Sequence, residues 1–250
     1  MMAKDEKTKT CPKHDLEYEP TEVAGIRAGC PKCEDERAEE WRLADAERKK
    51  VEASTRWQAK LEAAGIPKRF QSKTLLAYKA ECDGQRKALD WAREYAWSFE
   101  KTADSGRSAL LIGKPGTGKS HLAIAIALHL LEHGGTAWFG TVQQAVRKVK
   151  DSWGRKSKTT ESEAIASMTK PDLLILDEVG IQFGTNFESN LLFDILNERY
   201  AQMRPTILLS NLLADDVTEF LGERVLDRMR EDGGKVMVFD WDSYRAGGAS

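Results

Sequence analysis

Short apolar runs alternate with longer helical stretches from residue 108 to the C-terminal region. Five runs are candidate strands: SALLIG at Ser108, TAWFG at Thr136, DLLILDE at Asp172, TILLSN at Thr206 and KVMVFD at Lys235. Their apolar residues follow one another without alternation, which is typical of strands buried on both faces. Because helices separate them, they predict an α/β fold with a mainly parallel five-stranded sheet flanked by helices.

Two helices are expected before this sheet. Residues 35–64 are rich in Ala, Glu, Lys and Arg with few apolar positions, which predicts a long exposed helix ending at Gly65 and Pro67. Residues 84–99 carry an apolar stripe at helical spacing, so we expect that helix to lie against a surface. The Ser, Thr and Lys-rich stretch 151–169 predicts a surface excursion. We divide the chain into a segment 1–36, a helical linker 37–64 and a domain 65–250.

Composition limits the classes of protein that need consideration. The chain has 250 residues, 41% of them apolar, and its net charge of −2 comes from interleaved acids and bases. The apolar stretch 122–131 is well short of the ~20 residues that a membrane span requires, and the first residues lack the apolar core of a secretion signal. We therefore expect a cytoplasmic protein that does not engage a membrane, and any nucleic-acid site must be local.

Two similar turns near the N-terminus offer metal ligands. Cys11-Pro-Lys-His14 and Cys30-Pro-Lys-Cys33 each place two ligand-bearing side chains three positions apart. Such pairs converge on one tetrahedral ion, and three cysteines with one histidine form a closed structural zinc site. The alternative is a set of unrelated thiols in a flexible tail, against which the repeated Cys-Pro-Lys argues.

A glycine-rich loop follows the first predicted strand of the sheet. Its sequence, GKPGTGKS, fits the phosphate-binding pattern in the required context of a strand before it and a helix after it. Backbone N–H groups of such a loop face an anion, Lys119 can reach the β- and γ-phosphates of ATP, and Ser120 can ligate Mg²⁺. The alternative is a glycine turn that precedes a helix by coincidence. The expected nucleotide-binding residues are Gly113, Lys114, Pro115, Gly116, Thr117, Gly118, Lys119, Ser120 and the following His121.

Polar residues end the third and fourth predicted strands. Asp177 and Glu178 follow four apolar residues, and Asn211 ends the next strand. At this edge of an open α/β sheet, Asp177 would hold Mg²⁺, Glu178 would polarise an attacking water and Asn211 would orient it. The pair of acids favours hydrolysis over phosphoryl transfer to another acceptor. Simple loop solvation and a turn residue are the alternatives.

A local basic cluster surrounds Trp153. Lysines and arginines can follow a phosphate backbone while the indole stacks on a base, which suits single-stranded DNA bound without regard to sequence. A solvated charged face is the competing interpretation. The basic residues of the cluster are Arg147, Lys148, Lys150, Arg155, Lys156 and Lys158.

Several segments together resemble the bacterial DnaC-type helicase loaders, which belong to the AAA+ ATPases. The stretches GERVLDRMR from Gly222 and WDSYR from Trp241 are the most specific; GIPKRF from Gly65, GKPGTGKS and LLILDEVG are also similar. The resemblance covers residues 57–245. It implies an ATPase that binds the replicative DNA helicase, with the N-terminal region as the contact by analogy only, and delivers it onto single-stranded DNA.

The same resemblance implies self-association through the ATP sites. An arginine of GERVLDR is expected to reach the γ-phosphate of a neighbouring subunit: Arg228 first, Arg224 second, since both lie on one helical face. Ion pairs within a surface helix are the alternative. Arg245 matches a position that contacts nucleotide in its own subunit, and the helical lid that often follows in AAA+ proteins is not expected.

Three functions remain open from the sequence. The first is a helicase loader, and the second is a transposition accessory ATPase of the related IstB type, acting on target DNA. The third, a small-molecule P-loop kinase, leaves the arginines of GERVLDR unexplained. The WDSYR and GERVLDRMR segments favour the first.

Overall fold

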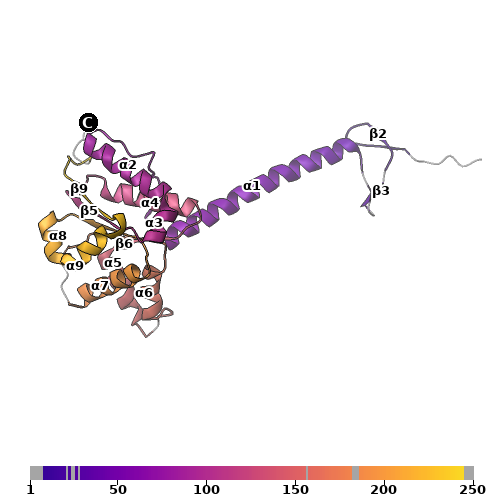
Figure 1. Cartoon of the computed structure of the whole chain (residues 1–250). Coiled ribbons are helices and arrows are strands. Elements are labelled where there is room, and N and C mark those ends of the chain that lie inside the picture. Colours follow the sequence, from indigo (N-terminus) through magenta and orange to yellow (C-terminus); the bar gives the residue numbers. More distant parts are fainter. Residues whose placement is uncertain are drawn as a thin grey trace, which may run out of the picture. The chain divides into compact units, whose positions relative to one another are not determined.

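The computed structural model describes residues 8–20, 22–23, 26–27, 29–155, 157–181 and 186–244 (Figure 1). The chain divides into two compact units, Met1–Ala59 and Lys60–Ser250. Lys156 and Arg245, both singled out above, lie outside the described residues.

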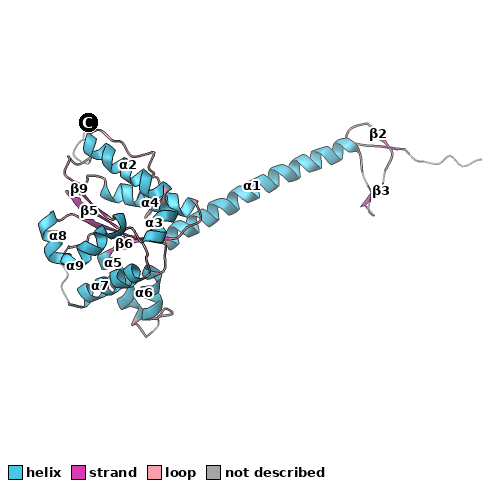
Figure 2. Ribbon diagram, viewed as in Figure 1, coloured by secondary structure: helices cyan, strands magenta, loops and turns pink. Residues whose placement is uncertain are grey.

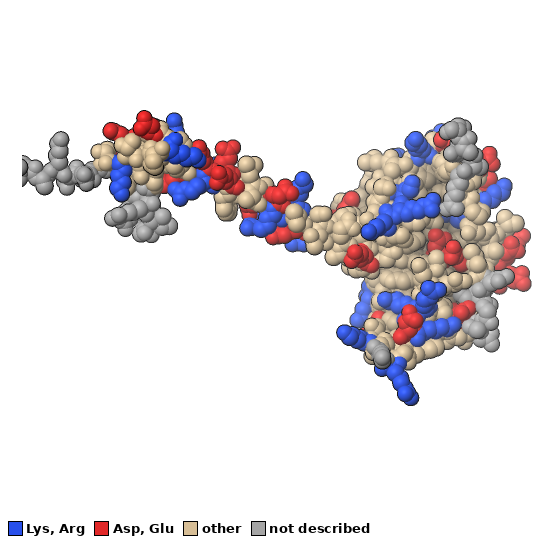
Figure 3. All heavy atoms as spheres, turned by 180° about the vertical axis from the view of Figure 1, so that it is seen from behind, with Lys and Arg blue, Asp and Glu red and all other residues tan. Residues whose placement is uncertain are grey.

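The first unit contains two short antiparallel strand pairs and most of one long helix. Strand β1 (Lys9–Thr10) pairs with β2 (Glu17–Tyr18), and β3 (Glu22–Val23) pairs with β4 (Ile26–Arg27). Helix α1 (Pro31–Ala63) begins four residues before the predicted start, because a proline is tolerated in the first turn of a helix. Acidic and basic side chains alternate along its surface (Figure 3), which agrees with the exposed helix that the composition predicts.

The second unit is built on a five-stranded sheet that confirms the predicted fold class. Its strands are β5 (Ala109–Gly113), β6 (Ala137–Thr141), β7 (Leu173–Asp177), β8 (Thr206–Ser210) and β9 (Lys235–Phe239). They pair in the order β6-β7-β8-β5-β9, with all four pairings parallel. The carboxyl ends of all five strands therefore meet at one edge of the sheet.

Helices cover both faces of this sheet (Figure 2). Alternate strand residues such as Leu110, Ile112 and Leu174 pack in one core with helices α5 to α9, and α4 contacts the sheet through β6, β7 and β8 with α2 against it. Each fully buried leucine or isoleucine contributes about 1.5–3 kcal/mol relative to an exposed one. The helices are α2 (Asp83–Trp97), α3 (Phe99–Ser105), α4 (Lys119–Glu132), α5 (Val142–Ser152), α6 (Glu161–Thr169), α7 (Asn186–Ala201), α8 (Ala214–Leu221) and α9 (Glu223–Arg230), with 3-10 turns η1 (Lys68–Phe70) and η2 (Glu231–Gly233).

The stretch 151–169 is only partly the irregular excursion that its composition predicts. Its second half forms α6, which buries Ala164 and Met168. The Thr160 side chain accepts a hydrogen bond from the Glu163 N–H while the Glu163 carboxylate accepts one from Thr160, so both exposed backbone donors at this helix start are satisfied. A buried apolar pair and a capped start outweigh the polar composition.

No helix among the described residues has the length and apolar character needed to cross a membrane.

Candidate functional site

The glycine-rich loop adopts backbone conformations that glycine alone adopts without strain. Gly113, Gly116 and Gly118 have φ of 131°, 81° and 99°. A Cβ on Gly113 would lie 2.2 Å from the Phe239 carbonyl oxygen, and one on Gly118 would lie 2.8 Å from the Tyr78 ring. The loop turns the chain from the end of β5 into the start of α4, whose first N–H groups can receive an anion.

Lys119 is the buried cation of this loop. Its Nζ donates hydrogen bonds to the carbonyl oxygens of Gly113 (2.6 Å) and Lys114 (2.8 Å), and the residue is 5% exposed. Burial lowers the pKa of Lys119 to about 8, while the nearby Asp177 carboxylate acts in the opposite direction. The lysine therefore titrates near the physiological range, and a phosphate brought beside it would favour its charged form.

The loop and the third strand of the sheet meet through Ser120 and Asp177. Ser120 Oγ donates to Asp177 Oδ2 at 2.7 Å, and the Glu178 N–H donates to Asp177 Oδ1 at 2.8 Å. A hydroxyl and a carboxylate this close are the protein ligands that Mg²⁺ takes in P-loop NTPases, where it neutralises phosphate charge. The donor set fits that cation.

Glu178 occupies the left-handed region of backbone conformation, with φ of 60°. This region costs a non-glycine residue about 1–3 kcal/mol and persists where surrounding contacts fix the chain. Here the Val179 N–H donates to the Leu209 carbonyl at 2.9 Å, and Ser210 Oγ donates to the Val179 carbonyl at 2.6 Å. Two bonds from β8 thus hold the turn that exposes Glu178 at the end of β7.

These groups line one cavity of about 660 Å³ at the carboxyl edge of the sheet. Asp177, Glu178 and Asn211 share it with part of the glycine-rich loop. Among the other loop residues, Gly113 and Lys114 supply carbonyls to Lys119, and Thr117 Oγ1 donates to the Lys114 carbonyl at 2.8 Å. The lining includes the predicted residues Pro115, Gly116, Gly118, Lys119, Ser120, His121, Asp177, Glu178 and Asn211, together with Pro67, Arg69, Phe70, Lys73, Ala77, Tyr78, Lys79, Phe139, Thr141, Gln144 and Tyr244.

The chain after β9 braces the loop, a contact that sequence reasoning did not identify. Trp241 Nε1 donates to the Thr117 carbonyl at 2.8 Å, and the Tyr244 N–H donates to the Gly116 carbonyl at 3.0 Å. The indole of Trp241 also packs on Phe239, with ring centroids 4.7 Å apart. The WDSYR segment, noted above only for its resemblance, therefore supports the phosphate-binding loop directly.

The two α9 arginines lie away from this cavity. Arg228 lines a small crevice with Ser108 and Thr206, which stand at the amino ends of β5 and β8. Its guanidinium donates to Asn197 Oδ1 and lies 4.5 Å from the centroid of the Tyr200 ring. Arg224 is exposed and, among the described residues, has no ion-pair or hydrogen-bond partner.

The basic residues on α5 are exposed, and Trp153, the aromatic residue beside them, is about half exposed. Trp153 is 53% exposed, its Nε1 donates to Glu161 Oε2 at 2.8 Å, and its ring meets Phe187 edge-on at 5.1 Å. Lys150 pairs with Glu188 at 3.3 Å. Arg147 and Lys148 are exposed, and basic side chains gather on this lower part of the second unit in Figure 3.

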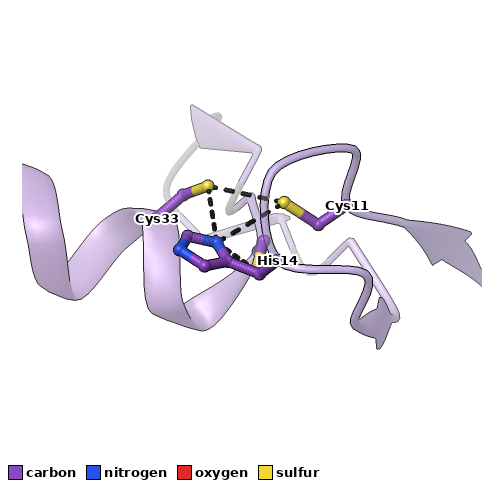
Figure 4. A group of neighbouring side chains, drawn as sticks. Cys11, His14 and Cys33 are labelled. Carbon is purple, nitrogen blue, oxygen red and sulfur yellow. Dashed lines mark hydrogen bonds between the residues drawn. The ribbon is translucent and has the colours of Figure 1, made fainter.

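The first unit brings together the four predicted metal ligands. Figure 4 labels three of them, Cys11, His14 and Cys33. His14 Nδ1 lies 3.6 Å from Cys11 Sγ, 3.8 Å from Cys30 Sγ and 3.4 Å from Cys33 Sγ, and the Cys11 and Cys33 sulfurs are 3.5 Å apart. Ligands around a tetrahedral zinc ion lie about 3.5–3.8 Å from one another, given Zn–S near 2.3 Å and Zn–N near 2.0 Å. The cluster fits zinc.

A carboxylate outside the predicted ligand set orients the histidine. Glu36 Oε1 lies 3.0 Å from His14 Nε2, and Glu36 Oε2 accepts a hydrogen bond from Lys13 Nζ at 2.6 Å. A carboxylate on the second ring nitrogen leaves Nδ1 free to face the sulfurs. Glu36 stands three residues after Cys33 in α1, and this helical spacing places the two on one side of the helix, which is the signal by which the sequence could have indicated it.

A family comparison, a sequence comparison and a structure comparison all relate the chain to ATP-binding proteins of one group. The family described as IstB-like ATP binding protein matches residues 43–248, so the cysteine cluster precedes the matched region. The chain is 37% identical over 189 residues to the replicative helicase loader DnaC of Escherichia coli (strain K12), covering 76% of each, and 35% identical over 207 residues to DnaC of Buchnera aphidicola subsp. Schizaphis graminum, covering 83% of each. A crystal structure of the DnaC helicase loader matches with a TM-score of 0.61 at 22% identity, covering 69% of this chain and 99% of that one. This structural match supports the fold.

Proposed function

The chain belongs to the IstB-like ATP binding protein family, and on that basis we propose that it loads the hexameric replicative DNA helicase onto single-stranded DNA, using ATP hydrolysis as the switch. The observation that carries the proposal is the 37% identity to the DnaC loader over three quarters of both chains. The cavity geometry supports the ATP-dependent part, because Lys119, Ser120 and Asp177 lie together in one cavity at the carboxyl edge of the sheet.

The glycine-rich loop, Asp177, Glu178 and Asn211 each have a role in hydrolysis under this proposal. The loop N–H groups and Lys119 hold the phosphates, and Ser120 and Asp177 hold Mg²⁺, which supplies charge neutralisation when bound. Glu178 takes the proton of the attacking water, and Asn211 orients that water beside the γ-phosphate. Tyr244, which lines the cavity, and the Trp241 indole, which does not, both hold the loop in shape through hydrogen bonds to its carbonyl groups.

Self-association through the ATP sites would bring a further cation to the cavity. The described lining already contains Lys119, Arg69, Lys73 and Lys79, and the proposed neighbouring subunit would add an arginine to them. Arg228 lies in a crevice near the amino ends of β5 and β8, and Arg224 lies on the same helix, α9, where a neighbouring subunit could receive them. Arg228 is already held by Asn197 and Tyr200, whereas Arg224 is exposed, which supports Arg224 as the residue that reaches across.

Mixing two inactive variants of the chain shows which of these two arginines acts in the neighbouring ATP site. Arg224→Ala protein would bind ATP normally but lose hydrolysis, and mixing it with Glu178→Gln protein would restore activity, because one intact interface then combines a wild-type Glu178 with a wild-type Arg224. Arg228→Ala serves as the comparison on the same helix. Recovery with Arg228→Ala alone would reverse the assignment.

The N-terminal cluster is proposed to hold a structural zinc ion. Its four ligands leave no open coordination position for catalysis, so the ion would fold a surface rather than perform chemistry. This surface precedes the family match at residue 43, and we propose it as the part of the chain that contacts the helicase. The exposed basic residues of α5 are proposed to contact single-stranded DNA.

Association with the helicase tests the proposal directly. Size-exclusion chromatography with light scattering would be run on the chain mixed with its host's hexameric helicase, with and without ATP. A joint complex that weakens when residues 1–64 are deleted supports the loader function. Lys119→Ala protein provides the control, because it should fold while failing to respond to ATP. If no complex forms under any nucleotide condition, the proposal is wrong.

A second function is favoured by the family match itself. The matched family is named for IstB-like proteins, and a transposition accessory ATPase would use the same cavity on target DNA. Such a protein would bind duplex DNA and a transposase in the presence of ATP and leave the helicase unbound. The same chromatography with duplex DNA in place of helicase distinguishes the two.

A further inference from the structure

The nucleotide cavity contains a buried polar atom that the roles above do not use. Tyr78 is 5% exposed, and its buried hydroxyl makes no hydrogen bond of normal geometry among the described residues, although the Tyr244 side chain acts on it. In the described part of the chain, two other buried side-chain atoms also lack a bond of normal geometry, Arg107 Nε and Thr169 Oγ1, but neither residue lines the cavity. Because a buried hydroxyl without a partner lowers stability, its retention at a binding cavity points to a ligand.

The Tyr78 ring lies directly on the glycine-rich loop. A Cβ built on Gly118 would stand 3.1 Å from the Tyr78 hydroxyl, which places that oxygen beside the backbone that receives phosphates. The ring also meets His121 edge-on at 5.2 Å and Tyr244 edge-on at 5.8 Å. The hydroxyl therefore sits where the loop joins a group of aromatic side chains.

The cavity lining contains two chemically different groups. Asp177, Glu178 and Asn211 follow the ends of two neighbouring strands and suit the terminal phosphate and its cation. Tyr78 and Tyr244 contact each other edge-on and form an aromatic group, which suits the flat base and the ribose of a nucleoside. Small-molecule sites of this kind use few polar groups among apolar ones to fix orientation.

The hydroxyl is also in the right protonation state to serve as both donor and acceptor. Burial first, and the Tyr244 side chain second, raise the pKa of Tyr78 far above its ordinary value, so the proton is retained at every pH at which the protein would work. A neutral hydroxyl offers one donor and two acceptor positions.

We infer that Tyr78 is a specificity-determining residue whose hydroxyl hydrogen-bonds the nucleoside portion of the bound nucleotide. The inference rests on the proposed function, since it presumes that the glycine-rich loop holds the phosphates of ATP. Tyr78 distinguishes one nucleoside from another through this hydrogen bond and does not take part in hydrolysis.

The test compares Tyr78→Phe with wild-type protein by isothermal titration against ATP, ADP and inorganic tripolyphosphate. Loss of one hydrogen bond should weaken ATP and ADP binding about five- to tenfold and leave tripolyphosphate binding unchanged. The melting temperature of the protein without nucleotide should change little, because the hydroxyl makes no hydrogen bond of normal geometry among the described residues.

Tyr95→Phe is the matched control. The Tyr95 hydroxyl is fully buried in α2 and donates to the Arg107 carbonyl at 2.7 Å, outside the cavity. That variant should show a lower melting temperature and unchanged ATP affinity, the opposite of the result expected for Tyr78→Phe.

Wild-type protein gives a measurement that does not depend on a variant folding. Either 2′-deoxyATP or GTP should bind at least fivefold more weakly than ATP, the first if the ribose is read and the second if the base is read. Equal binding of all three nucleotides overturns the inference, and so does unchanged ATP affinity in Tyr78→Phe. An equal loss for tripolyphosphate assigns the contact to phosphate and overturns it as well. If wild-type protein binds no ATP, the proposed function itself fails.

Discussion

At the residue scale, the charge of Lys119 depends on the loop that surrounds it. Two carbonyl oxygens accept its hydrogen bonds, and burial lowers its pKa to about 8. Below pH 8 the side chain is charged and attracts phosphate; above it, the neutral fraction rises and the attraction weakens. Because bound phosphate favours the charged form, ATP binding should take up a proton at alkaline pH.

ATP affinity should therefore fall with rising pH. We expect the Kd to be nearly constant from pH 7 to 7.5 and to increase by up to about tenfold per pH unit above pH 8, since each lost proton must be restored on binding. Isothermal titration in buffers of different ionisation enthalpy measures both the Kd and the proton uptake. Constant affinity up to pH 9.5 would show that Lys119 keeps its charge without ATP.

Glu36 should strengthen metal binding without being a ligand. Replacing it with alanine removes the carboxylate that faces His14 Nε2, and loss of such a contact typically weakens metal affinity 10–100-fold. Competition with a calibrated chelator gives the zinc affinity. Glu39→Ala, an exposed position one helical turn further along α1, is the control. Equal affinities for the two variants would exclude an orienting role for Glu36.

The sequence predicts those site residues that belong to one contiguous stretch with a recognisable pattern. Lys119 and Ser120 belong to one contiguous pattern, and Asp177 follows an uninterrupted apolar strand. Tyr78 and Tyr244 could not be found this way, because they reach Gly118 and Gly116 only after the chain has folded. Such contacts between distant segments leave no periodic or spacing signal.

At the element scale, the five strands were predictable and α6 was not. Strand β7 places four consecutive fully buried residues, Leu173 to Leu176, in the sheet, so its apolar run is unambiguous. Helix α6 has nine residues and buries few side chains, which leaves a weak pattern inside a polar stretch. The Thr160 and Glu163 pair at its start was the local signal available.

The exposed face of α5 should contribute the salt dependence of DNA binding. Replacing Arg147 and Lys148 with alanine removes two positive charges that have no ion-pair partner in the described part of the chain. If each contacts one phosphate, the slope of log affinity against log salt should decrease by about 0.7 per residue for single-stranded DNA. Fluorescence anisotropy at several salt concentrations measures the slope.

Lys87→Ala is the control for this experiment, because Lys87 is an exposed base on α2. An unchanged slope for the α5 variant would identify the basic cluster as a solvated surface. A loss that is equal for α2 and α5 would indicate general attraction to the protein's charge.

At the scale of the whole molecule, the two units depend on different sources of stability. Among the side chains described in residues 8–59, only Cys11 and Cys30 are buried, so the first unit has no apolar core of its own. A segment of this kind folds when a metal supplies the cross-link. The second unit contains a large core between its sheet and helices.

Removing the metal should therefore affect one unit only. After treatment with a strong zinc chelator, we expect amide-exchange protection to be lost around residues 8–36 and retained in the sheet. The melting temperature of the second unit and its ATP affinity should stay unchanged, because its core contains none of the four ligands. Unfolding of the sheet on chelation would contradict the independence of the two units.

Helicase loading onto circular single-stranded DNA tests the central claim most directly, because a circle has no end over which a closed ring could thread. Purified helicase, the chain and ATP would be mixed with the circle, and the helicase that co-elutes with DNA would be counted. We predict helicase on the circle with the wild-type chain and little with Lys119→Ala. Equal amounts with and without the chain would contradict the account.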